Sequence, residues 1–159
     1  MASTILGISP GTRIMGLGVI QNGELVEWQV KTFKGSWSKE KLRLIIDNIQ
    51  SISDHFKVSV IALKVVSPLR TSKNLLNLTK GIMETAEKNK IRLSRFTGQD
   101  LKLRAEPAEK HSSSDLMEFV LDKYPVLKRE YLKERNNLNP YYFKMFEAIA
   151  AALIAERTR

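Results

Sequence analysis

The opening of the chain restricts the fold more than any other feature. Two short apolar runs, residues 4–8 and 15–20, are separated by Ser9-Pro10-Gly11, and Asn22-Gly23 follows the second run. Asn-Gly between two strands is the strongest short-range signal for a two-residue β-hairpin. A third run, residues 25–31, continues after this turn with side chains that alternate between the two faces of a strand. The sequence therefore predicts that the chain begins as a three-stranded antiparallel meander.

Helical and strand patterns then alternate along the chain. Apolar side chains at helical spacing predict helices over residues 42–56 and 72–86, and apolar runs predict strands over 58–66 and 91–97. A loop is expected over 104–114, followed by a helix capped by Ser112, Ser113 or Ser114. Pro140 is expected to open a last helix whose alanine-rich stretch 148–155 packs closely on a sheet. This order is typical of an α/β fold with a mixed five-stranded sheet, and we expect a single domain over 1–159.

One segment has no predicted topology. Residues 123–139 are mostly charged, and four side chains are candidates for anchoring them to the body of the protein: Tyr124, Leu127, Tyr131 and Leu132.

Composition excludes several classes of function. The chain has no cysteine and two histidines, so it cannot form a disulfide framework, a thiolate nucleophile or a Cys-ligated metal site. We found no run long enough to span a bilayer and expect a cytoplasmic protein with no membrane partner and no small-molecule substrate. The formal net charge of +9 favours binding of polyanions such as nucleic acid.

Residues 5–20 resemble a known family. They read I-L-G-I-S-P-G-T-R-I-M-G-L-G-V-I, which is similar without a gap to the opening I-L-G-I-D-P-G-T-x-x-x-G-Y-G-V-I of RuvC-type Holliday-junction resolvases. Further along, Ile61-Ala62-Leu63-Lys64 resembles the A-I-E strand of that family, and Glu147-Ala148-Ile149-Ala150 resembles the D-A-L-A of its last helix. The resemblance implies an RNase H-like fold, metal-dependent cleavage of four-way DNA junctions and a homodimer.

The resemblance also locates a site that this chain has altered. Four acidic positions hold Mg²⁺ in the family, and they correspond here to Ser9, Lys64, Lys144 and Glu147. Only Glu147 is acidic, so the four positions carry one net positive charge where the family pattern carries four negative charges. Because a divalent cation needs several oxygen ligands, we expect no bound metal, no other cofactor and no catalytic residue at these positions.

Lys64 lies within a β-branched run, where an unpaired ammonium is costly to bury. We expect it to occupy roughly the space of a metal ion and to pair with Glu147. Lys144 precedes Glu147 by three residues, so both lie on one face of the helix, and Lys144 is a candidate to share the pairing.

These observations favour a RuvC-like protein that binds branched or duplex DNA without cleaving it. The candidate DNA contacts are Arg13, Arg70, Lys73, Lys102, Arg104, Lys110 and His111. One alternative is an active Mg²⁺ nuclease that recruits acids outside the family positions, namely Glu84, Asp100, Glu106 or Glu109. A second alternative is a protein-interaction module with no nucleic-acid role.

Overall fold

The computed structural model describes residues 3–105, 113–136 and 140–158. Strands β1 (Thr4–Ser9), β2 (Ile14–Gln21) and β3 (Glu24–Thr32) form an antiparallel meander, as the sequence predicts. At the β2–β3 turn, Asn22 has a φ of 53° and Gly23 a φ of 84°. Positive φ at both central residues is what a type I′ turn requires, so the Asn-Gly pair accounts for this hairpin.

Two further strands complete a mixed sheet. Strands β4 (Val60–Val65) and β5 (Arg92–Thr97) run parallel to β1, and the strand order is β3-β2-β1-β4-β5. The predicted five-stranded mixed sheet is therefore confirmed. Because β1 and β4 are parallel neighbours, with Leu6 opposite Ile61, their carboxyl ends meet at the same edge of the sheet.

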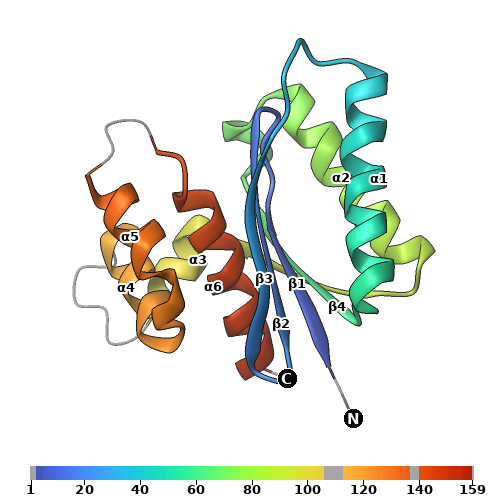
Figure 1. Cartoon of the computed structure of the whole chain (residues 1–159). Coiled ribbons are helices and arrows are strands. Elements are labelled where there is room, and N and C mark those ends of the chain that lie inside the picture. The colour runs from blue at the N-terminus through green and yellow to red at the C-terminus, as the bar shows by residue number, and fades with distance from the viewer. Residues whose placement is uncertain (1–2, 106–112, 137–139, 159) are drawn as a thin grey trace.

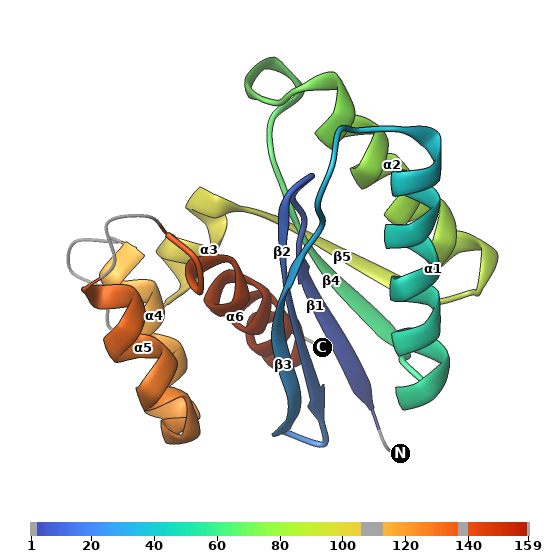
Figure 2. The same ribbon diagram turned by 45° about the horizontal axis from the view of Figure 1, so that its top comes forward.

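Helices cover both faces of the sheet (Figures 1 and 2). On one face lie α1 (Lys39–Phe56) and α2 (Lys73–Lys88), and a one-turn 3₁₀ helix, Pro68–Arg70, precedes α2. On the other face lies α6 (Phe143–Arg157), and on this side of the sheet are also α3 (Gly98–Arg104), α4 (Ser113–Lys123) and α5 (Lys128–Arg135). A second 3₁₀ turn, Pro125–Leu127, joins α4 to α5. None of the described helices is both long and apolar enough to cross a membrane.

Helix α6 lies very close to the sheet because glycines face it. A Cβ atom on Gly7 would overlap the backbone carbonyl of Ala148, and one on Gly16 would overlap the backbone carbonyl of Lys144. Residues 145–155 of α6 are all buried, and alanine makes up much of this stretch. Small side chains on both surfaces therefore bring the helix backbone against β1 and β2, which confirms the close packing predicted for residues 148–155.

The structure differs from the predicted elements at α3 and at the start of α6. Helix α3 was not predicted, because it is too short to show a repeating pattern of apolar residues. It begins with a reciprocal capping box between Thr97 and Asp100. It ends at Arg104, where the predicted loop begins. Most of that loop lies outside the described residues, including Ser112, which immediately precedes the first residue of α4, Ser113. Helix α6 begins at Phe143, so Pro140 precedes the helix and does not open it.

The described part of the charged segment, residues 123–136, folds against the body of the protein. Tyr124, Leu127 and Tyr131 are buried, and the Tyr124 hydroxyl donates to the carbonyl of Gly23 at 2.9 Å. Leu132 is 44% exposed, so its prediction as an anchor was wrong. The segment is held by aromatic side chains, which supply both apolar area and a polar tip.

Candidate functional site

The four positions indicated by the family resemblance meet at one edge of the sheet. Ser9 is the last residue of β1, Lys64 lies next to the end of β4, and Lys144 and Glu147 lie in the first turns of α6. The parallel pairing of β1 with β4 brings Ser9 and Lys64 to the same edge, and α6 begins over that edge. Residues that are 138 positions apart in sequence are thereby brought into contact.

Glu147 is the centre of this cluster. Its Oε1 atom accepts a hydrogen bond from the Ser9 hydroxyl at 2.9 Å, and its Oε2 atom lies 3.7 Å from Nζ of Lys64. The Glu147 side chain is only 6% exposed and that of Lys64 is 17% exposed. The predicted pairing of Lys64 with Glu147 is confirmed.

Lys144 is held differently from the prediction. Its ammonium donates to the backbone carbonyl of Pro10 at 3.2 Å, in the turn that follows β1. Burial and the nearby positive charge of Lys64 lower the pKa of Lys144 below its usual value of 10.5, and the Glu147 carboxylate partly opposes this effect. The two ammonium groups therefore repel each other, and a single carboxylate compensates them incompletely.

This repulsion predicts a pH-dependent stability. Between the lowered pKa of folded Lys144 and 10.5, the unfolded chain holds a proton that the folded chain has released, so the free energy of unfolding rises with pH. We expect wild type to gain stability relative to Lys144→Met as the pH is raised from neutral toward 10.5. Urea unfolding of both proteins across this range measures the difference, and a difference that is flat or falls with pH contradicts it.

A buried acid on α5 fixes the start of α6. The Glu134 carboxylate accepts four hydrogen bonds, of 2.8–3.1 Å, from the backbone amides of Tyr141, Tyr142 and Phe143. No side chain at the N-cap position of α6 makes a capping bond. Glu134 therefore satisfies donors that a helix start leaves unpaired, and its negative charge suits the positive end of the helix dipole. The sequence offered only an indirect signal for this role. Tyr142 precedes the helix but is not a capping residue type, so the first amides of α6 need an acceptor from elsewhere in the chain.

Removing this cap is expected to loosen the site. Glu134→Gln replaces a charged acceptor of four bonds by an amide, which we expect to lower the free energy of unfolding by about 2 kcal/mol. Asp122→Asn, on an exposed part of α4, is the matched control and is expected to have little effect. Urea unfolding measures the loss, and amide hydrogen exchange at residues 141–143 locates it. Unchanged exchange at those amides would contradict the assignment.

The residues of this cluster do not fit a divalent metal. A hydroxyl, two ammonium groups and one carboxylate offer too few anionic oxygen ligands, and the ammonium groups repel a cation. Nowhere in residues 3–105, 113–136 and 140–158 do three or more His, Cys, Asp or Glu side chains gather in a way that could hold a metal ion. The metal-dependent cleavage that the family resemblance implies therefore has no ligand set at these positions.

Two cavities adjoin the Lys64–Glu147 pair. The smaller, of about 270 Å³, is lined by both of these residues and by Lys144, together with apolar and aromatic side chains. The larger, of about 660 Å³, is lined by the same pair and by Arg70 and Lys102, two of the candidate DNA contacts. Lys64 and Glu147 thus form a wall shared by both cavities.

The other candidate DNA contacts either do not line these cavities or lie outside the described residues. Arg13 is exposed between β1 and β2, and Lys73 is exposed at the first residue of α2. The Arg104 guanidinium lies 5.5 Å from the centre of the Phe96 ring. Lys110 and His111 lie outside the described residues. The structure therefore brings Arg70 and Lys102 to the site but not Lys73 or Arg104.

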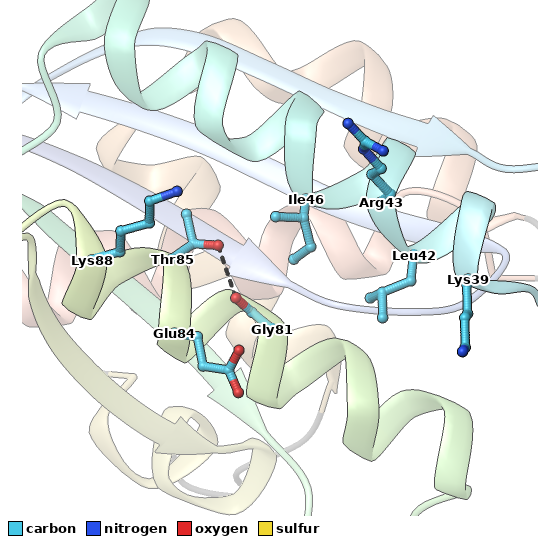
Figure 3. A pocket seen from close by; sticks show the side chains of 8 residues that line it. All are labelled: Lys39, Leu42, Arg43, Ile46, Gly81, Glu84, Thr85 and Lys88. Carbon is cyan, nitrogen blue, oxygen red and sulfur yellow. Dashed lines mark hydrogen bonds between the residues drawn. The ribbon is translucent and has the colours of Figure 1, made fainter.

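The acids of the alternative nuclease hypothesis do not gather near Ser9 within the described part of the chain. Glu84 lines a groove of about 320 Å³ between α1 and α2, on the face of the sheet opposite α6 (Figure 3). Asp100 accepts a hydrogen bond from the amide of Thr97 in the capping box of α3, and this bond lowers the pKa of Asp100. Glu106 and Glu109 lie outside the described residues.

Comparison with known proteins identifies the family. The model of the family described as crossover junction endodeoxyribonuclease RuvC matches residues 5–120. The crossover junction endodeoxyribonuclease RuvC of Dictyoglomus turgidum is 24% identical over 107 residues, which cover 62% of this chain and 68% of that protein.

Two solved structures show the same fold. The RuvC structure of Thermus thermophilus superposes with a TM-score of 0.70 at 16% identity, covering 94% of this chain and 91% of that one. RuvC of T. thermophilus in complex with a Holliday junction substrate superposes with a TM-score of 0.67 at 17% identity, covering 95% and 90%. The expected RNase H-like fold is confirmed. The chain therefore belongs to the RuvC family of crossover junction endodeoxyribonucleases.

Proposed function

We propose that this protein binds branched or duplex DNA and does not cleave it. The observation that carries the proposal is the charge of the site. At the positions where the family resemblance implies four acids there is one carboxylate, which accepts from Ser9 and pairs with Lys64, and a second ammonium, Lys144, which donates to Pro10. Phosphodiester cleavage by two metal ions requires a set of oxygen ligands that this cluster lacks.

DNA binding is supported by charge and by the family. The chain carries a formal net charge of +9, and Arg70 and Lys102 line the cavity next to Lys64. Phosphate contacts by such cations supply most of the affinity of proteins for DNA. A RuvC of the same fold has been solved with a Holliday junction substrate, which makes a four-way junction the first DNA structure to test.

The test combines binding with cleavage on the same substrates. A gel-shift titration compares a four-way junction, a duplex and a single strand at rising salt, and each substrate is then incubated with Mg²⁺ or Mn²⁺. We expect binding to the junction or duplex that weakens steeply with salt, and no cleavage. Cleavage by wild type would overturn the proposal in favour of a nuclease that uses other acids. Absence of binding to every substrate would favour the protein-interaction module.

We also propose that the protein acts as a homodimer, as the family resemblance implies. A four-way junction has two-fold symmetry, so a two-fold dimer would present one copy of the cluster to each half of the junction. Sedimentation velocity of the protein alone and of its junction complex tests this state. A complex containing one protein chain per junction at saturation would contradict it.

A further inference from the structure

The smaller cavity beside the Lys64–Glu147 pair has the chemistry of an anion site. Its charged lining consists of Lys64, Lys144 and Glu147, and the remaining residues that line it are apolar or aromatic. The Lys64 side chain is 17% exposed, so it is neither sealed in the core nor fully hydrated. In ligand-binding cavities, a small number of polar groups among mostly apolar side chains fixes the position of the ligand.

The donors in this cavity exceed the acceptors that contact them. Each lysine ammonium has three N–H donors. In the described contacts, that of Lys64 faces Glu147 at 3.7 Å and that of Lys144 donates to Pro10 at 3.2 Å. One carboxylate serves two cations, and their mutual repulsion contributes to lowering the pKa of Lys144. A bound anion would supply both the missing acceptors and the missing negative charge.

We propose that a backbone phosphate of the bound nucleic acid occupies this cavity, held by the ammonium groups of Lys64 and Lys144 without a metal ion. The inference rests on the proposed DNA binding and specifies its chemistry. Lysine binds phosphate as a point charge, and two lysines can each donate to a different phosphate oxygen. Lys64 and Glu147 also line the larger cavity with Arg70, so a nucleic-acid strand seated here would continue along a basic surface.

Three variants distinguish binding of phosphate at this site from non-specific attraction between DNA and the positive charge of the protein. Lys144→Gln removes one of the two cations and is compared with Lys88→Gln, which removes one exposed cation from α2 on the opposite face of the sheet. Lys144→Gln relieves the repulsion with Lys64, so we expect it to fold at neutral pH at least as stably as wild type. Lys144→Arg keeps the charge and serves as the rescue variant.

The first measurement is junction binding in EDTA and in Mg²⁺ as salt is varied. We expect wild type to bind equally well in both. For Lys144→Gln we expect affinity about tenfold lower and a log–log salt slope shallower by about 0.9, the effect of one lost phosphate contact. Lys88→Gln should stay close to wild type, and Lys144→Arg should recover most of the loss. Binding that requires Mg²⁺, or equal losses for the two Gln variants, would overturn the phosphate site while leaving DNA binding intact.

The second measurement uses inorganic phosphate and needs no DNA. Phosphate is added against sodium chloride of matched ionic strength, and amide chemical shifts are followed by NMR. We expect saturable shifts at the amides of residues 9, 11, 64 and 144 in wild type and none in Lys144→Gln. If wild type binds no DNA but shows these shifts, the proposed function fails and the anion site stands. If phosphate and chloride give the same shifts, the anion site fails.

Discussion

Glu147→Ala is expected to lower the free energy of unfolding by about 3 kcal/mol, because it leaves a partly buried Lys64 ammonium without its counter-charge. The substitution also removes the acceptor of the Ser9 hydroxyl, which is completely buried. The Ser9 hydroxyl loses its acceptor in the interior, where water cannot easily replace it. Equilibrium unfolding in urea at neutral pH measures the loss.

The group formed by Ser9, Lys64 and Glu147 permits a control that distinguishes the cost of leaving one charge unpaired from the net contribution of the whole group to stability. Replacing all three members with apolar residues, in Ser9→Ala/Lys64→Met/Glu147→Leu, removes the charges together. Because burying two ions costs about as much as their attraction returns, we expect this triple variant to be much closer to wild type than Glu147→Ala. If Glu147→Ala and the triple variant are equally destabilised, the loss comes from packing and the electrostatic account is wrong.

Restoring acids at the three altered positions is expected to create a metal site that wild type lacks. In Ser9→Asp/Lys64→Glu/Lys144→Asp, the three new carboxylates join Glu147 at the edge where β1, β4 and α6 meet. Oxygen ligands from several carboxylates are what Mg²⁺ and Mn²⁺ prefer. We expect calorimetric titration with Mn²⁺ to show binding to the triple variant and none to wild type.

Two further readouts keep this result interpretable. Four carboxylates that lie close together repel one another, so without metal the variant should be less stable than wild type, and added Mn²⁺ should raise its melting temperature but not that of wild type. Junction cleavage should then appear in the variant only with metal present. Equal Mn²⁺ binding by wild type and the variant would contradict the electrostatic account of this site.

The sheet was predictable from the sequence because its signals are local. Asn22 and Gly23 both adopt positive φ readily, which favours the type I′ turn of the hairpin. Along residues 25–31, successive side chains point to opposite faces of the strand, and the sequence shows this alternation. The pairing of Lys64 with Glu147 was also predictable, but only from the family resemblance, which assigns both residues to one site. The two residues are 83 positions apart, and helix and strand patterns carry no information over that separation.

Other features depended on contacts that no local pattern records. Helix α3 is short and is specified by the Thr97–Asp100 capping box, which a search for long apolar periods does not detect. Lys144 was expected beside Glu147, but its ammonium reaches the Pro10 carbonyl because α6 lies against the turn after β1. The position of that helix follows from glycines on the strands beneath it.

By itself, the sequence determined the five strands, the helices over residues 42–56 and 72–86 and the hairpin at Asn22-Gly23, because each of these depends on residue type and short-range spacing. The loss of acidic residues at three family positions was also visible in the sequence, through the family resemblance. Only the tertiary structure decided which polar groups contact one another. Ser9 and Lys64 contact Glu147, and Lys144 donates to the Pro10 carbonyl. Glu134 accepts from the backbone amides at the start of α6. The physical reason is that buried polar groups must find partners in space, and the packing of α6 on the sheet sets which groups are within reach.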